Sequence, residues 1–123
     1  KMEKQKPEVK VENPENMITF EDFKKVDLRT AEIVQAEKVD GADRLLKIQV
    51  KMGEDTRQIV AGIAEYYKPD DLIGKKVILV ANLKPVEIRG VESQGMLLAA
   101  SDESSLTLVG LDDNDLPSGL NVS

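Results

Sequence analysis

The sequence predicts an all-β domain with a few short helices, and three observations carry this prediction. Residues 46–52 (LKIQVKM) alternate strictly between apolar and polar side chains, which indicates a half-buried strand. Residues 75–83 (KKVILVANL) are apolar on both faces, which favours a central, fully buried strand. Short turn-forming stretches, DGADR (40–44) and GEDT (53–56), separate the apolar runs. A chain of 123 residues suffices for one core and not for two.

The first predicted strand covers residues 27–39 (DLRTAEIVQAEKV). Apolar and polar residues alternate up to Ile33 and then change phase, because Ile33 and Val34 are adjacent and Ala36 continues the new pattern. A one-residue phase change within a strand predicts a β-bulge or a sharp bend.

Two short helices are expected. Thr19 followed by Asp22 resembles a capping box that begins a helix, and Phe20 and Phe23 on one face of that helix are expected to plug the end of the core. Residues 65–75 (EYYKPDDLIGK) predict a second helix that Gly74 ends, with Pro69 marking a break before its last turn.

The remaining strands complete the pattern. Residues 57–64 predict a third strand, residues 94–101 a fifth, and residues 105–111 a short sixth segment. The order of three strands, a helix and two strands, with the first strand bent, is that of the OB-fold, a five-stranded Greek-key β-barrel. Such a barrel binds its ligand on the face of strands 2 and 3, between the loop joining strands 1 and 2 and the loop joining strands 4 and 5.

Three parts of the sequence place basic and amide groups around that predicted groove. The first loop carries Arg44, the outward positions of strand 2 are Lys47, Gln49 and Lys51, and the long loop before residue 96 carries Lys84, Arg89 and Ser93. Lysine and arginine contact phosphates, and Ser93 and Gln94 can hydrogen-bond sugar, phosphate or base edges. The alternative reading is that these are ordinary solvated charges, such as Lys84 and Arg89 paired with Glu87 and Glu92, and that Met96 belongs to the core.

Composition limits the chemistry that this domain can perform. The chain has no cysteine and no histidine, which removes thiolate chemistry, the commonest general base and the commonest metal ligand. No catalytic residue, metal site or cofactor is therefore predicted. No segment approaches the length of a membrane span, and a cytoplasmic location is expected.

Charge and aromatic content indicate how a nucleic acid would be recognised. The net charge is −6, but residues 102–123 contribute −5 of it, whereas residues 1–101 hold 17 basic and 18 acidic side chains. A nearly neutral body can carry a local basic surface. Tyr66 and Tyr67 lie in the second helix, so no aromatic stacking platform is expected, and the shape and backbone of a folded RNA is the expected ligand.

The chain divides into two parts. Residues 1–16 are rich in lysine, glutamate and proline and predict a flexible linker from a larger protein, and residues 17–123 form the domain.

Two long stretches, residues 26–50 and 57–100, resemble a known family of tRNA-binding OB-fold domains. The pattern ANLKP followed by RGVESQGMLLAA carries the resemblance, with VDLR and ADRLL in support. This domain occurs at the C-terminus of bacterial methionyl-tRNA synthetases, in free-standing tRNA-binding proteins and in the secretion-associated chaperone CsaA.

The resemblance implies a homodimer that binds tRNA and has no catalytic activity of its own. It also implies that the domain belongs to the same polypeptide as the catalytic body of a synthetase. The tRNA-contact candidates carried over from the family are Asn82, Lys84, Arg89, Ser93, Gln94 and Met96, and the predicted groove adds Arg44 and Lys47. The expected dimer interface comprises Phe20, Phe23, Leu106, Leu108 and Leu111. Two alternatives stay open: a free-standing dimeric tRNA-binding protein, and a CsaA-like chaperone that binds polypeptide.

Overall fold

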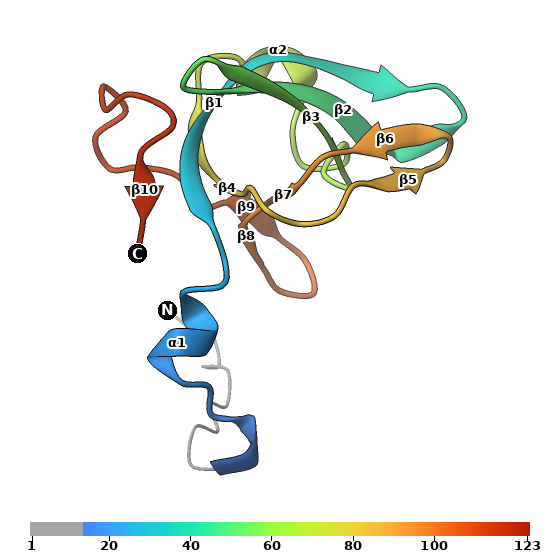
Figure 1. Ribbon diagram of the computed structural model, residues 1–123. Helices are drawn as coiled ribbons and strands as arrows, with labels where there is room; N and C mark the ends of the chain where they lie inside the picture. Colours follow the sequence, from blue (N-terminus) through green and yellow to red (C-terminus); the bar gives the residue numbers. More distant parts are fainter. Residues whose placement is uncertain (1–13) are drawn as a thin grey trace, which may run out of the picture.

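The computed structural model describes residues 14–123 (Figure 1). The predicted linker lies outside the described residues except for Pro14–Asn16, a single 3-10 turn (η1). The helices are α1 (Phe20–Phe23) and α2 (Pro69–Leu72), and the strands are β1 (Leu28–Val39), β2 (Ala42–Met52), β3 (Asp55–Ala61), β4 (Lys76–Val80), β5 (Val86–Ile88), β6 (Val91–Ser93), β7 (Met96–Leu97), β8 (Ala99–Ser101), β9 (Leu106–Leu108) and β10 (Asn121–Val122).

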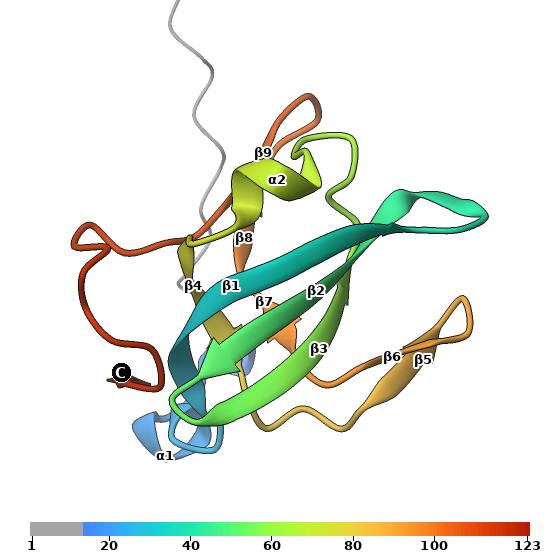
Figure 2. The ribbon, with the colours of Figure 1, turned by 90° about the horizontal axis from the view of Figure 1, so that it is seen from above.

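The strands form one antiparallel sheet and two separate hairpins. The sheet has the order β3-β2-β1-β4-β7, and β10 pairs with the first residues of β1. The hairpins are β5–β6 and β8–β9 (Figure 2). The all-β prediction is confirmed. Among residues 14–123, however, no strand ladder joins the two edge strands β3 and β7, so closure into a barrel by pairing is not seen.

The predicted phase change in β1 is confirmed as a β-bulge. Ile33 pairs with Val50, but the next pair is Gln35 with Gln49, so Val34 is the extra residue. Ile33 is fully buried and Val34 is exposed. The bulge therefore lets one long strand follow the curved sheet while it keeps its apolar side chains on the inner face.

Alternating side chains from the strands build the core on the inner face of the sheet. Leu46, Ile48 and Val50 of β2 are fully buried, as the alternation predicts, and all four residues from Val77 to Val80 in β4 are buried. Burial of each large aliphatic side chain contributes about 1.5–3 kcal/mol. The core thus fixes β1, β2 and β4 as the rigid base from which the loops extend.

Both helices differ from the prediction. The Thr19–Asp22 capping box is confirmed, but α1 stands away from the sheet (Figure 1), and Phe20 is 68% exposed. The expectation that Phe20 and Phe23 plug the core is therefore wrong. Helix α2 begins at Pro69 instead of breaking there, because a proline without N–H is well suited to the first helical turn.

The predicted fifth strand at residues 94–101 is divided. Its first part is β7, which pairs with β4, and its second part is β8, which leaves the sheet to pair with β9. Leu98 lies between them, and its amide still donates to the carbonyl of Ile78 (3.1 Å).

The C-terminal segment returns to the start of β1 and is held there by one buried threonine. The hydroxyl of Thr30 accepts from the amide of Leu120 and donates to the carbonyl of Pro117, both at 2.9 Å. Gly119 crosses Gly53 so closely that a Cβ would lie 2.8 Å from the Gly53 nitrogen. None of the helices in residues 14–123 has the length and apolar character needed to cross a membrane.

Candidate nucleic-acid interface

The long loop of the sequence contains a projecting hairpin, which we call the arm (residues 86–93, strands β5 and β6). Figure 2 shows it extending sideways from the sheet, next to the turn between β1 and β2. The sequence analysis missed this hairpin: Val-Glu-Ile and Val-Glu-Ser alternate on either side of Arg-Gly, but Arg-Gly is not one of the dipeptides that usually signal a two-residue turn.

The tip of the arm holds Arg89 in a strained backbone conformation. Ile88 pairs with Val91, so Arg89 and Gly90 are the two turn residues, with φ angles of 52° and 80°. A hairpin turn with two positive φ angles favours asparagine, aspartate or glycine at its first position. An arginine in this left-handed conformation costs about 1–2 kcal/mol.

Arg89 and Arg44 line the same cleft. This tip cleft has a volume of about 450 Å³ and lies between residues 41–45 and residues 88–89. Arg44 reaches Glu65 at 3.6 Å but is 80% exposed, so the pair is weak. Arg89 has no ion pair with any residue in the range 14–123. Two exposed arginines thus line one cleft, and arginine can bind a phosphate with two hydrogen bonds.

A second hollow lies at the base of the arm, and we call it the apolar cavity. It has a volume of about 470 Å³ and shares Ile88 with the tip cleft. Lys84 and Met96 line it, and Met96 is 48% exposed. Most of its other lining residues are apolar: Val60, Ile63, Leu83, Val86, Leu97, Leu106 and Leu108.

Lys47 lies on the outer face of β2, apart from both hollows. Its ammonium group is 3.8 Å from Glu37 of β1, and its side chain is only one-third exposed. Among the predicted cations, Lys47 therefore has its positive charge most fully balanced by a neighbouring carboxylate. Its neighbour Gln49 donates to Gln58 of β3 at 3.0 Å.

Three predicted contact residues make side-chain hydrogen bonds to other parts of the chain. The amide of Asn82 accepts from Asp27 (2.9 Å) and donates to Lys25 (2.7 Å), so it ties β4 to the entry of β1. Ser93 is 2% exposed, and its hydroxyl accepts from the Val60 amide (3.0 Å). The side-chain oxygen of Gln94 accepts from the backbone of Gln58 (2.9 Å). These partners lie far away in the sequence, which is why the local pattern could not reveal them.

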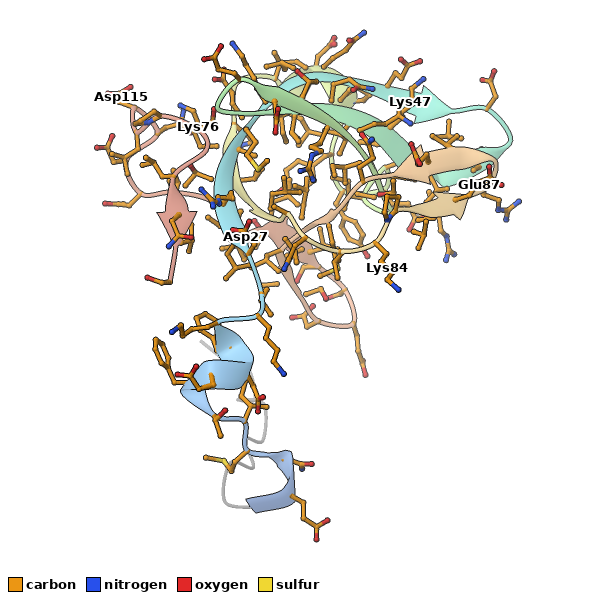
Figure 3. The ribbon with its side chains drawn as sticks, viewed as in Figure 1. Asp27, Lys47, Lys76, Lys84, Glu87 and Asp115 are labelled. Carbon is orange, nitrogen blue, oxygen red and sulfur yellow. The ribbon has the colours of Figure 1, made fainter. Side chains whose placement is uncertain are left out.

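Charge is distributed unequally over the domain. Figure 3 shows Lys47, Lys84 and Glu87 on the side of the arm, and Asp115 with Lys76 on the opposite side. The C-terminal acidic residues near Asp115 therefore add their negative charge away from the arm. Four predicted cations, Arg44, Lys47, Lys84 and Arg89, come from the arm, its base and the neighbouring β1–β2 region, although only Arg44 and Arg89 share a cleft.

The fold and this surface define a class: a small, mostly β module with a projecting hairpin, whose exposed Arg89 together with Arg44 can approach a nucleic-acid backbone. Within residues 14–123, no cluster of three or more histidine, cysteine, aspartate or glutamate side chains could hold a metal.

Comparison with known proteins identifies the family. Residues 28–120 match the family described as "Putative tRNA binding domain". The chain belongs to this family of tRNA-binding domains.

Curated relatives and solved structures agree with this assignment. The chain is 56% identical over 106 residues to a methionine–tRNA ligase from Caldanaerobacter subterraneus subsp. tengcongensis, covering 86% of the chain and 16% of the relative. It is 52% identical over 124 residues to the methionine–tRNA ligase of Deinococcus radiodurans, covering 99% of the chain and 18% of the relative. The chain thus spans less than a fifth of the length of these relatives.

Two solved structures share the fold. A MetRS-related protein from Pyrococcus horikoshii superposes with a TM-score of 0.82 at 37% identity, covering 88% of this chain and 99% of that one. The chaperone CsaA from Bacillus anthracis superposes with a TM-score of 0.79 at 30% identity, covering 87% of this chain and 99% of that one.

Proposed function

We propose that this domain is the tRNA-binding and dimerisation module of a cytoplasmic methionyl-tRNA synthetase. The main support for the proposed tRNA-contact site is that two exposed arginines, Arg44 and Arg89, line the tip cleft, and that Arg89 lies in a strained turn. Their guanidinium groups can contact phosphates in a forked geometry, so the site reads the backbone of tRNA and not its sequence.

The proposed contact surface is narrower than the sequence suggested. Arg44 and Arg89 form its centre, Lys84 and Met96 extend it along the base of the arm, and Lys47 adds charge from the outer face of β2. Asn82, Ser93 and the side-chain oxygen of Gln94 bond to the protein, so we assign these residues an indirect role. In the synthetase, a tethered weak site raises the local concentration of tRNA and strengthens capture without altering the catalytic step.

Dimerisation is proposed through the N-terminal segment. Met17, Ile18 and Phe20 are each more than 60% exposed, and α1 buries no residue in its own chain. Phe23, Leu106, Leu108 and Leu111 are half-buried and form the rest of the proposed interface. A second copy of the chain would cover these apolar groups and place two tRNA sites in one assembly.

Titration of tRNA across a range of salt concentrations tests the tRNA site. The logarithm of the binding constant should fall linearly with the logarithm of the salt concentration, by about 0.7–0.9 for each phosphate contact. The double variant Lys84→Ala/Arg89→Ala should lower this slope by about 1.4–1.8 and leave the thermal midpoint close to that of the wild type. A salt-independent affinity, or full affinity in the double variant, would refute the proposed surface.

The apolar cavity favours a second candidate function, the binding of an exposed apolar polypeptide segment, as in a chaperone. Its lining is mostly aliphatic, and Leu83, Val86 and Met96 are exposed at it. Competition between tRNA and an unfolded polypeptide, with Met96→Asp as the variant, separates the two candidates. Loss of polypeptide binding in this variant supports the second candidate, whereas absence of any polypeptide binding by the wild type excludes it.

A further inference from the structure

The free edge of β3 is held by Ser93 at the end of the arm and by Gln94 directly after it, instead of by a neighbouring strand. The Val60 amide donates to the Ser93 hydroxyl (3.0 Å), and the Gln58 amide donates to the side-chain oxygen of Gln94 (2.9 Å). The Gln94 amide in turn donates to the Gln58 carbonyl (2.7 Å). These bonds attach the root of the arm to the rigid sheet.

Gln58 has a central place in this attachment, because both its backbone groups and both its side-chain groups are hydrogen-bonded. Besides the two backbone bonds to Gln94, its side-chain nitrogen donates to the Glu92 carbonyl of the arm (2.8 Å). Its side-chain oxygen accepts from Gln49 of β2 (3.0 Å), which orients the amide. Three of the four bonds thus reach the arm or the residue that follows it, and the fourth anchors Gln58 to the centre of the sheet.

Apolar packing fixes the direction of the arm only in part. Ile88 and Val91 are half-buried, Val86 is 55% exposed, Glu87, Arg89, Gly90 and Glu92 are exposed, and in the arm only Ser93 is buried. An isolated two-stranded hairpin is marginally stable in water. The hydrogen bonds at the root of the arm therefore contribute to its direction.

We propose that Gln58 is a positioning residue for tRNA binding: it holds the arm at the angle that places Arg89 opposite Arg44 in the tip cleft. The inference rests on the proposed tRNA site and adds a residue that no sequence motif indicated. From Ser93 to Arg89 the arm extends four residues, about 13 Å. A rotation of about 10° at the root moves the tip by about 2 Å, which is enough to break a hydrogen bond of about 3 Å to a phosphate.

The test uses Gln58→Leu, with Gln35→Leu as the matched control. Gln35 lies in the same cross-strand row, opposite Gln49, but is exposed, and its side chain has no hydrogen bond to the described residues. We measure tRNA affinity and its salt slope for both variants, for Arg89→Ala, and for Gln58→Leu combined with Arg89→Ala. Trypsin cleavage after Arg89 in the free domain serves as a readout that needs no tRNA.

A positioning role predicts that Gln58→Leu weakens tRNA binding about tenfold, the contribution of one hydrogen bond to a charged group. It also predicts that the salt slope falls by about 0.7–0.9, as in Arg89→Ala. In the Arg89→Ala background, Gln58→Leu should add less than about twofold, because the contact that it positions is already gone. Cleavage after Arg89 should accelerate in Gln58→Leu and stay at the wild-type rate in Gln35→Leu.

Three results would overturn the inference. The first is a tRNA affinity and salt slope in Gln58→Leu equal to those of the wild type. The second is that Gln58→Leu weakens tRNA binding equally in the wild-type and Arg89→Ala backgrounds. The third is that trypsin cleaves after Arg89 at the same rate in Gln58→Leu as in the wild type. If Gln58→Leu fails to fold, Gln49→Leu replaces it in the test. This variant removes only the bond that orients the Gln58 amide, so it must weaken tRNA binding and accelerate cleavage to a smaller extent. If Gln49→Leu changes neither, the proposal is rejected. If the wild-type domain does not bind tRNA, the proposed function fails, while the cleavage rates still decide whether Gln58 holds the arm.

Discussion

Replacement of Arg89 by asparagine should make the domain more stable and at the same time a weaker tRNA binder. Arg89 has a φ angle of 52° at the first position of a two-residue hairpin turn, where asparagine is favoured. The left-handed conformation costs an ordinary residue about 1–2 kcal/mol, and asparagine avoids a substantial part of that cost. We therefore expect a gain of about 0.5–1 kcal/mol in the free energy of unfolding, or about 2–4 °C in the midpoint.

Binding should change in the opposite direction. Because Arg89 has no ion pair within residues 14–123, its removal leaves no carboxylate unpaired there, and the loss comes from the missing phosphate contact. One such contact corresponds to about a tenfold loss of affinity and a decrease of about 0.7–0.9 in the salt slope.

Urea denaturation and salt-dependent tRNA titration measure the two effects on the same preparation. Arg44→Asn is the control, since Arg44 is exposed at the opposite wall of the tip cleft and has no positive φ angle. It should weaken tRNA binding without stabilising the domain. If Arg89→Asn is no more stable than the wild type, the turn does not store strain. If it binds tRNA with full affinity, Arg89 is not a contact residue.

Three further predictions concern the fold and the assembly. Thr30→Val should lower the free energy of unfolding by about 1–3 kcal/mol in urea denaturation, because two backbone groups of the C-terminal segment lose their partner; a change below about 0.5 kcal/mol would show that this segment is not a stabilising element. Gly95→Ala should destabilise far more than Gly41→Ala in thermal melts, since both have positive φ angles but only at Gly95 would a Cβ lie 2.9 Å from the Val80 carbonyl; equal effects would contradict the close approach. Phe20→Ser should convert a dimer to a monomer in analytical ultracentrifugation with little change in the thermal midpoint, and an unchanged sedimentation coefficient would reject α1 as the interface.

Much of the fold could be predicted because its determinants are local. The alternation in β2, the apolar run of β4, the bulge at Val34 and the capping box at Thr19 each depend on residues within a few positions of one another. Side-chain alternation and helix capping depend on residues within that range, so the sequence alone indicated the long strands β1 to β4, their order along the chain and the bend in β1.

The structure brings some of the predicted site residues together and separates others. Arg44 and Arg89 were selected from separate loops, and the structure places them at one cleft. Ser93 and Gln94 were selected from the same loop as possible ligand contacts, yet their partners Val60 and Gln58 lie more than 30 residues away.

A serine or glutamine side chain can form a hydrogen bond to a ligand or to a distant strand. The residue type alone does not show which of these partners it has. From the sequence by itself came the class of the domain and the residues that carry positive charge. Only the tertiary structure decided which polar groups were already occupied, that the arm projects, and that Phe20 is exposed. The physical reason is that a hydrogen bond or a buried contact needs both of its partners in space, and chain folding brings together partners that the sequence keeps far apart.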